Sequence, residues 1–378
     1  MIIQRPWWQS RIKLLMQHRP IVWLTGVRRV GKTVLCQSLE NVKYFDCELP
    51  SVRREMEDPE LFLKAHDGML LALDEIHRLE DPALLLKIAA DHFPRIRVIA
   101  TGSSTLGASS KFRDTLAGRK SELYLTPLCE ADSNFPQYND RTRRFLNGGL
   151  PSFYLADLRD ERDYSEWMEA FWARDILELF RLERRNSFLK FAELLFAQSS
   201  GRFNASSFAT SCGVSRTTIL NYLSILEATH LVYVVRPYHG GNAKEIVATP
   251  CVYGFDTGFV AWAQGLHEIP PKEKGFMWEH LVLNEIAAVT QHKDIMHWRD
   301  KQGHEVDFVI EGEGKAPLAI EAKWNADAFD PDGLQAFRKL HPNGVNLVVS
   351  ANVDNAYTRT VSGLEVSFCS LAYLRQGV

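Results

Sequence analysis

Apolar positions in the first third of the chain follow two alternating patterns. Short apolar runs bounded by polar or turn residues predict buried strands, whereas apolar residues spaced three or four positions apart predict helices. The predicted strands lie at 21–24, 42–45, 69–73, 96–100 and 123–127. The predicted helices lie at 7–18, 32–40, 52–65 and 82–93. This alternation predicts an α/β fold, a parallel sheet with helices on both faces and with ligands at the carboxyl ends of its strands.

The loop after the first predicted strand has the spacing of a phosphate-binding loop. Residues 25–33 read Thr-Gly-Val-Arg-Arg-Val-Gly-Lys-Thr and lie between a predicted strand and a predicted helix, which is the context that the motif requires. Glycines let backbone N–H groups close around phosphates, Lys32 reaches the terminal phosphates, and the Thr33 hydroxyl can ligate Mg²⁺. A glycine-containing turn with a chance lysine is the alternative. We expect ATP to be bound by Gly26, Arg29, Val30, Gly31, Lys32 and Thr33.

Polar residues end the third and fourth predicted strands. Asp74 and Glu75 follow the third strand directly. There Asp74 would hold Mg²⁺, and Glu75 would orient or deprotonate the attacking water. In P-loop ATPases with a catalytic glutamate, a polar side chain after the next strand senses the γ-phosphate, a role for Thr101 or Ser103. These positions predict ATP hydrolysis.

A helicase is a second interpretation of the same segment. Asp74-Glu-Ile-His77 fits the D-E-x-H box of nucleic-acid helicases. The phosphate loop, however, ends in Arg-Val-Gly-Lys-Thr, no Ser-Ala-Thr element follows, and no second motor domain with its arginine motif is visible downstream. The AAA interpretation fits the whole segment better.

Several short segments together resemble the prokaryotic AAA-type ATPases that carry a C-terminal domain of unknown function with a nuclease-like fold. The matching segments are 25–33, 73–77, 101–104, 116–119 with 125–128, and 148–151. The resemblance covers nearly the whole chain and implies an AAA-type core over residues 1–135. It also implies that Arg119 acts as a finger or sensor on the γ-phosphate, with a surface arginine in a basic loop as the alternative. An AAA arginine finger acts across a subunit boundary, so we expect a homo-oligomer.

Beyond residue 136 the predicted strands give way to helices rich in Phe, Trp and Arg. Gly148-Gly-Leu-Pro151 separates two of these helices, 141–147 and 164–182, and another is predicted at 188–199. We expect residues 136–200 to form a helical lid over the nucleotide site.

A helix-turn-helix pattern is predicted over 206–226. Cys212-Gly-Val214 would supply the turn and Ser215 would cap the second helix. Three polar side chains of that helix would then point outward, where they can contact phosphates and base edges of DNA in a major groove. They are Arg216, Thr217 and Asn221.

Two apolar segments, 231–235 and 251–253, would form the wing of a winged-helix domain over residues 201–265. Winged helices also serve as protein-packing modules. The sequence leaves both interpretations open, DNA contact and protein packing.

Residues 266–378 have the predicted order α, β, β, β, α, β, which resembles the restriction-endonuclease-like fold. Glu305-Val-Asp307 and Ile320-Glu-Ala-Lys323 resemble its PD-(D/E)XK signature, although the Asp-Pro pair of that signature is absent. We therefore expect a nuclease-like α/β domain, with an inactive scaffold as the alternative.

The chemistry of that signature explains the residue types. Asp307 and Glu321 would share a further Mg²⁺ or Mn²⁺ ion, and Lys323, on the same strand face as Glu321, would assist the water that attacks phosphate. Glu279, on the preceding helix, would complete the acidic set.

Composition and charge change this picture only slightly. The chain has 378 residues, of which 46% are hydrophobic and 24% charged, and its net charge of −3 gives no general attraction to nucleic acid. The six cysteines include no Cys-x-x-Cys pair, so neither a disulfide framework nor a structural zinc site is predicted. No apolar run is long enough to cross a bilayer and no signal peptide is recognisable, so we expect a cytoplasmic protein without a membrane partner.

The sequence thus predicts an AAA-type ATPase that uses ATP and Mg²⁺, acts on DNA and carries a nuclease-like domain. The alternative from another class is a regulatory or scaffolding NTPase whose C-terminal domains bind protein partners.

Overall fold

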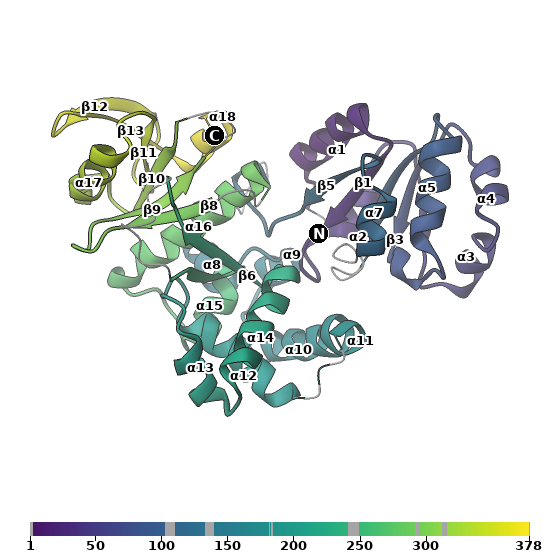
Figure 1. The fold of residues 1–378 in the computed structure, drawn as a ribbon, viewed down its shortest axis with the longest axis horizontal. Helices are drawn as coiled ribbons and strands as arrows, with labels where there is room; N and C mark the ends of the chain where they lie inside the picture. Colours follow the sequence, from purple (N-terminus) through teal and green to yellow (C-terminus); the bar gives the residue numbers. More distant parts are fainter. Residues whose placement is uncertain are drawn as a thin grey trace. The chain divides into compact units, whose positions relative to one another are not determined.

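The computed structural model describes residues 3–102, 110–132, 140–180, 182, 184–240, 249–291, 295–311 and 316–377 (Figure 1). Contacts divide the chain into two units. The first consists of Met1–Phe135, Leu150–Leu155 and Ser165–Glu183, and the second of Pro136–Gly149, Ala156–Tyr164 and Arg184–Val378. The chain therefore passes between the units repeatedly.

The first unit contains a parallel sheet with the strand order β2-β3-β4-β1-β5. The strands are β1 Ile21–Thr25, β2 Val42–Asp46, β3 Leu70–Asp74, β4 Arg97–Thr101 and β5 Lys120–Tyr124. Parallel pairing brings all the carboxyl ends to one edge, as the apolar runs predicted. Only β5 lies several residues earlier than predicted, because Pro127 lacks the N–H that a strand would donate there.

Helices cover both faces of this sheet. On one face lie α1 Pro6–His18 and α2 Lys32–Gln37. The other face is covered by α4 Pro59–Ala65, α5 Pro82–His92 and α7 Ser110–Thr115. The single helix predicted at 52–65 is in fact two, α3 Pro50–Glu55 and α4, because Asp58 caps the second one by accepting a hydrogen bond from the Leu61 N–H at 3.0 Å.

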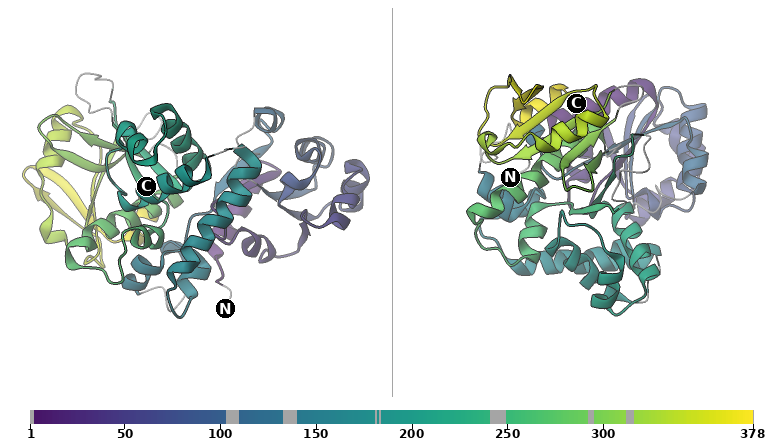
Figure 2. Two further views of the ribbon diagram at one scale, coloured as in Figure 1. Left: turned by 90° about the horizontal axis from the view of Figure 1, so that it is seen from below. Right: turned by 60° about the vertical axis from the view of Figure 1, so that its left-hand side comes forward.

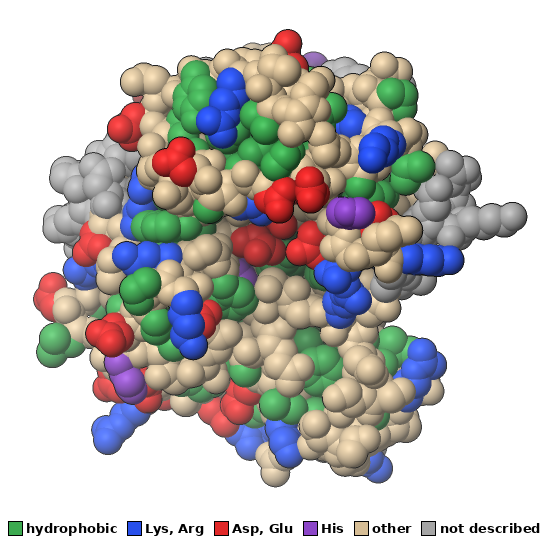
Figure 3. All heavy atoms as spheres, turned by 90° about the vertical axis from the view of Figure 1, so that its left-hand side faces the viewer, with side chains coloured by type: hydrophobic (Ala, Val, Ile, Leu, Met, Phe, Trp, Pro, Cys, Tyr) green, Lys and Arg blue, Asp and Glu red, His purple; other side chains and the backbone are tan. Residues whose placement is uncertain are grey.

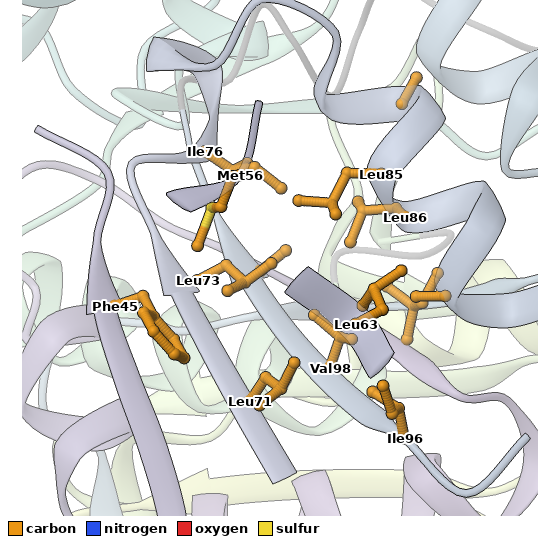
Figure 4. Packing of buried hydrophobic residues seen from close by; sticks show 14 of the residues in the cluster. Phe45, Met56, Leu63, Leu71, Leu73, Ile76, Leu85, Leu86, Ile96 and Val98 are labelled. Atoms are coloured by element: carbon orange, nitrogen blue, oxygen red, sulfur yellow. The ribbon is translucent and has the colours of Figure 1, made fainter. Parts of the chain in front are cut away.

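Alternate strand residues form the core under α4 and α5 (Figure 4). Leu71 and Leu73 of β3 and Val98 of β4 pack with Leu63 of α4 and Leu86 of α5. All five side chains are buried, and each contributes roughly 1.5–3 kcal/mol to stability. This packing fixes the strand ends on which the polar residues lie.

Part of the predicted lid packs within the first unit. The helix predicted at 164–182 is α10 Glu161–Phe171, followed by the π-helical turn η4 Trp172–Ile176 and α11 Leu177–Phe180. The short helix α9 Pro151–Leu155 also belongs to this unit. Trp167 of α10 donates a hydrogen bond from Nε1 to the carbonyl oxygen of Arg28 at 3.3 Å, so this segment contacts the phosphate loop.

The second unit contains a mixed sheet with the strand order β12-β13-β11-β10-β9-β8-β6-β7, coloured from teal-green to yellow in Figure 2. The strands are β6 Val232–Pro237, β7 Cys251–Gly254, β8 Ile295–Arg299, β9 Glu305–Ile310, β10 Leu318–Lys323, β11 Asn346–Ser350, β12 Tyr357–Val361 and β13 Leu364–Cys369. With α16 Lys274–Thr290 and α17 Asp332–Leu340, they give the predicted order α, β, β, β, α, β.

Two features of this sheet were not predicted. The β12–β13 hairpin was missed because the side chains of β12 are mostly exposed and its sequence is therefore polar. In addition, β6 pairs in parallel with β8, so the strands expected to form a separate wing belong to the same sheet as the nuclease-like strands.

Further α-helices that the structure describes in the second unit are α8 Arg141–Asn147, α12 Arg185–Ala197, α13 Ala205–Cys212, α14 Arg216–Ala228, α15 Thr257–Ala263 and α18 Leu374–Gly377. The predicted helix-turn-helix pair is present as α13 and α14. Gly213 ends α13 in a left-handed conformation with φ 65°, and Ser215 caps α14 by accepting from the Thr218 N–H at 3.0 Å. In the described part of the chain, no helix combines the length and the apolar character needed to span a bilayer.

Candidate active site

The phosphate loop connects β1 to α2 and depends on its glycines. A Cβ on Gly26 would lie 2.6 Å from the carbonyl oxygen of Leu125, and Gly31 has a φ of 102°, so neither position accommodates a larger residue without strain. Lys32 donates from Nζ to the carbonyl oxygens of Gly26 at 2.8 Å and Val27 at 3.1 Å. The lysine side chain therefore folds back over the loop, where it contacts carbonyl oxygens in the region that phosphates would occupy.

Other predicted loop residues have different surroundings. Arg29 is exposed, with a positive φ of 61°. Val30 is buried, and its carbonyl oxygen accepts a hydrogen bond from Nη1 of Arg5 at 3.3 Å. The Val30 side chain thus belongs to the core, and only its backbone can contribute to binding.

Asp74, at the end of β3, is the centre of a cluster of polar side chains. Its Oδ2 accepts hydrogen bonds from the hydroxyls of Thr33 at 2.6 Å and Tyr44 at 2.8 Å. Its Oδ1 accepts one from the Thr101 hydroxyl. The structure therefore brings the predicted metal ligands Thr33 and Asp74 together with Thr101, and the side chain of Asp74 is buried.

Tyr44 was not among the predicted residues. It lies in β2, two positions before the strand ends, and β2 pairs with β3 so that Tyr44 is opposite Ala72. Its hydroxyl reaches past this register to Asp74. The only sequence signal was a polar atom near the end of a strand beside β3.

Glu75 has an unusual backbone and a charged environment. Its φ is 53°, a left-handed value that costs a residue with a Cβ some conformational energy. Its N–H donates to the Thr101 hydroxyl at 3.1 Å, and its Oε2 lies 3.2 Å from Nδ1 of His77. Burial acts to raise the pKa of Glu75, but the His77 hydrogen bond and the Lys32 charge outweigh it and leave the pKa below its ordinary value. The carboxylate is thus kept ionised.

A further acidic residue, Asp175 of η4, lies near the same loop. Its Oδ2 is 3.8 Å from Nη1 of Arg28. Burial lowers the pKa of Lys32, and the charges of Glu75, Asp175 and Asp74 oppose that change. Asp175 was missed because the long stretch of sequence between it and the loop gave no reason to place them together.

A cavity of about 230 Å³ begins at Gly31 and extends along α2 within the first unit. Apolar residues form most of its wall, namely Ile3, Val34, Leu35, Pro151 and Leu155. Arg5, Ser38 and Ser152 add polar atoms. Its position beside the last glycine of the phosphate loop makes it accessible to a group attached to bound phosphates.

Arg119 does not lie with this cluster. It immediately precedes β5, whose first residue, Lys120, is opposite Ile21 at the start of β1. The phosphate loop follows the other end of β1, about 13 Å further along the strand. Arg119 instead binds Asp91, from Nε to Oδ1 at 2.6 Å and from Nη2 to Oδ2 at 2.9 Å. Within one chain, therefore, Arg119 cannot serve as a sensor for its own phosphate loop. The other sensor candidate, Ser103, lies outside the described residues.

The nuclease-like residues of the second unit do come together. Nζ of Lys323 lies 2.7 Å from Oε2 of Glu321 and 3.3 Å from Oδ2 of Asp307. Asp307 also accepts a hydrogen bond from the N–H of Ala322 at 2.9 Å. The lysine thus pairs with both carboxylates at the centre of the cluster.

Glu279 lies near the charges of Asp307 and Lys323, and its hydrogen-bond partner is a residue that sequence reasoning missed. The Tyr253 hydroxyl donates to Oε1 of Glu279 at 2.6 Å. Burial, together with the nearby charge of Asp307, raises the pKa of Glu279 to about 8. Among the residues that the structure describes, no group of three or more His, Cys, Asp or Glu side chains is arranged to hold a metal ion, so the expected second Mg²⁺ or Mn²⁺ ion gains no support.

The predicted DNA-contacting residues Arg216, Thr217 and Asn221 are all exposed on α14. Arg216 and Arg202 line a polar hollow of about 450 Å³ together with Asn204 and Ser206. Figure 3 shows one face of the molecule, where Lys and Arg side chains are scattered and acidic side chains gather near the centre. The described side chains on this face therefore form no continuous basic surface.

Sequence comparison gives the class of the first unit. The family described as an AAA domain matches residues 18–132. The first unit contains an ATPase-like AAA domain. Two families described as domains of unknown function, DUF8612 and DUF4143, match residues 138–269 and 274–367. The predicted P-loop ATPase core is thus confirmed, whereas these matches specify neither a winged helix nor a nuclease.

Similar proteins are known in two mycobacteria. The uncharacterized protein Rv2008c of Mycobacterium tuberculosis and the uncharacterized protein Mb2031c of Mycobacterium bovis are each 28% identical over 337 residues, which cover 85% of this chain and 74% of theirs.

Solved structures show weaker similarity. The Walker-type ATPase paby2304 of Pyrococcus abyssi aligns with a TM-score of 0.44 at 16% identity, covering 70% of this chain and 96% of its own. The AMPPCP-bound DnaA of Aquifex aeolicus aligns with a TM-score of 0.32 at 14% identity, covering 60% and 89%. The class of the first unit therefore rests on the AAA match and the geometry of its loop.

Proposed function

We propose that the chain binds and hydrolyses ATP with Mg²⁺ at the phosphate loop. The observation that carries the proposal is the Asp74 cluster, in which one buried carboxylate accepts hydrogen bonds from Thr33, Tyr44 and Thr101. A hydroxyl and a carboxylate at the end of a phosphate loop are oxygen ligands of the kind that Mg²⁺ prefers. Thr33 and Asp74 would hold the ion, which would neutralise charge developing on the phosphates.

The protein groups around this site have separate roles. Lys32 would turn from the carbonyl oxygens of the loop to the terminal phosphates. Glu75, held ionised by His77 and Lys32, would orient the attacking water or accept its proton. Thr101, which donates to Asp74 and accepts from the Glu75 N–H, would fix the positions of these two residues relative to each other.

The cavity next to Gly31 would receive the nucleobase. Its mostly apolar wall suits the faces of a purine ring, and the polar atoms of Ser38 and Ser152 can bond the ring edge. Its location beside the loop fits a nucleotide whose phosphates lie over Gly31.

Equilibrium binding of ATP tests the first step of this function. Wild type should bind ATP more tightly with Mg²⁺ than with a chelator, and Lys32→Ala should lose most of that affinity. Equal affinity of wild type and Lys32→Ala would remove the phosphate loop from binding. Replacing the exposed Lys13, whose Nζ pairs with Glu40 at 3.0 Å, by alanine gives a matched control.

DNA binding is a second proposed function, carried by the hollow on α13 and α14. Arg202 and Arg216 both line it, and neither makes a side-chain hydrogen bond or ion pair with another described residue. Two arginines without acidic partners are suited to phosphate oxygens of a nucleic-acid backbone. Thr217 and Asn221 lie exposed on the same helix, where they would reach bases.

A nuclease activity is the third element of the proposal. It is supported by the order α, β, β, β, α, β and by the proximity of Asp307, Glu321 and Lys323. Any cleavage should need these three residues and should be separable from ATP hydrolysis, since Asp307→Ala leaves the first unit unchanged. Assays of linear, branched and single-stranded DNA in Mn²⁺, with and without ATP, test this. If wild type cleaves none of these substrates, the domain is a binding scaffold.

The alternative is a nucleotide-gated regulatory or scaffolding protein whose second unit binds other proteins. The ATPase rate with and without DNA separates the two interpretations. Clear stimulation by duplex, single-stranded or branched DNA supports action on DNA, whereas no effect from any of them supports the protein-binding role.

A further inference from the structure

A carboxylate from a distant part of the sequence lies beside the phosphate loop. Asp175 belongs to the π-helical turn η4, and its Oδ2 is 3.8 Å from Nη1 of Arg28 inside the loop. Trp167, on the preceding helix, donates from Nε1 to the carbonyl oxygen of Arg28 at 3.3 Å. Two contacts to one loop residue therefore hold this segment against the loop, and all three residues belong to the first unit.

The pair formed by Arg28 and Asp175 is incomplete. A separation of 3.8 Å is too long for a hydrogen bond. Oδ2 of Asp175 and Nε of Arg28 are both buried, and neither has a hydrogen-bond partner among the residues that the structure describes. Polar atoms buried without partners are unfavourable. One donor of this arginine thus has no acceptor among the described residues, inside a loop whose backbone N–H groups suit an anion.

The charges around Asp175 are those that a phosphate would use. Burial raises the pKa of Asp175, and the charges of Arg28 and Lys32 act to lower it. Asp175 therefore lies in the positive field of the same two cations that a bound phosphate would approach. A phosphate group carries more negative charge than one carboxylate and offers more acceptor oxygens, so it would compete successfully for them.

We propose that Asp175 is a positioning residue that the terminal phosphates of a nucleoside triphosphate displace from Arg28. This proposal rests on the proposed binding of ATP at the phosphate loop. Once phosphate pairs with Arg28 and Lys32, the Asp175 carboxylate loses the attraction of both cations and is repelled by the like charge. The π-helical turn, an irregular geometry often found at functional sites, would then leave its position on the loop.

The chain gives this movement a route to the second unit. The segment Ser165–Glu183 belongs to the first unit, but Tyr164 before it and Arg184 after it belong to the second. A nucleotide-dependent shift of the segment would thus act on both covalent connections. Asp175 would link nucleotide occupancy to the part of the chain proposed to bind DNA.

The test uses the full chain with Asp175→Asn, which keeps the shape of the side chain and removes its charge. Glu166→Gln makes the same change of charge at an exposed position of α10 and is the matched control. Binding of fluorescent ATP and ADP analogues should be about three- to tenfold tighter for Asp175→Asn, with the larger gain for ATP. Glu166→Gln should bind both as wild type does.

Hydrogen exchange of the peptide covering 165–180 gives a second readout. In wild type, ATP should raise exchange in this peptide, and Asp175→Asn should show raised exchange before nucleotide is added. Unchanged or weaker ATP binding by Asp175→Asn, with wild type still binding ATP, would overturn the displacement proposal alone. If wild type bound ATP no better than Lys32→Ala, the proposed nucleotide site itself would fail.

Discussion

The hydroxyl of Thr33 donates a hydrogen bond to Oδ2 of Asp74 at 2.6 Å, which joins the end of the phosphate loop to the end of β3. The two side chains are 41 positions apart in the sequence, and the parallel sheet brings them to one edge. Their contact places the two proposed oxygen ligands of Mg²⁺ together. Such preorganisation lowers the cost of assembling a magnesium site.

Tyr44 should tune the proposed magnesium site. Because its hydroxyl donates to the same oxygen of Asp74 at 2.8 Å, Tyr44→Phe removes a contact that orients the carboxylate. Loss of such an orienting partner weakens metal affinity by about tenfold or more. We expect Tyr44→Phe to need more Mg²⁺ for half-maximal ATP hydrolysis. At saturating Mg²⁺ its hydrolysis rate should be closer to that of wild type. Tyr357→Phe, at an exposed tyrosine, is the control, and an identical Mg²⁺ requirement in Tyr44→Phe would exclude this role.

Arg119 should act on the nucleotide of another subunit, since it lies at the sheet edge opposite its own phosphate loop. We expect Arg119→Ala to bind ATP normally and to lose turnover by about a thousandfold or more, which is the effect of removing an arginine finger. Mixing it with Lys32→Ala, which keeps Arg119 but lacks ATP binding, should restore part of the activity. Full turnover by Arg119→Ala alone would show that this arginine is a surface residue paired with Asp91.

The buried Glu279 predicts a pH-dependent stability. Its folded pKa of about 8 lies above the unfolded value near 4.5, so the folded state binds the extra proton between these pH values and loses stability as the pH rises through them. Glu279→Gln, which mimics the protonated form, should be more stable than wild type by up to a few kcal/mol at pH 8. The difference should shrink toward pH 5. Urea unfolding at several pH values measures it, and a difference that does not change with pH would contradict the raised pKa.

The polar hollow on α13 and α14 predicts the salt dependence of DNA binding. If Arg202 and Arg216 each neutralise a phosphate, replacing either with alanine should weaken binding and reduce the slope of log affinity against log salt by about one. Lys339→Ala, at an exposed lysine of α17, should change neither. Unchanged affinity and slope in both arginine variants would make the helix-turn-helix a packing module.

Local motifs explain how much of the site could be predicted. Lys32 and Thr33 begin the helix after the β1 loop, and Asp74, Glu75 and Thr101 lie at the ends of β3 and β4. The strand pattern alone therefore placed all five on one edge of the sheet. The nuclease-like signature was also local. Asp307 lies within β9, and Glu321 and Lys323 lie together within β10.

Tertiary packing explains what could not be predicted. Tyr44 and Asp175 reach the nucleotide site through contacts across the fold, which no spacing in the sequence encodes. The pairing of β6 with β8 likewise depends on a contact between strands far apart in the sequence. For Arg119 the motif suggested too much. It predicted a role at the γ-phosphate, but the sheet register places Arg119 too far from the phosphate loop of its own chain.

Steady-state ATP hydrolysis by wild type and Glu75→Gln, with ATP binding measured in parallel, tests the central claim most directly. Glu75→Gln keeps the size of the side chain but removes the charge that orients or accepts a proton from water. The account predicts Mg²⁺-dependent turnover by wild type, and in Glu75→Gln unchanged ATP affinity with turnover lower by about a hundredfold or more. Turnover by Glu75→Gln equal to that of wild type, or no turnover by wild type with Mg²⁺ and ATP at saturation, would contradict it.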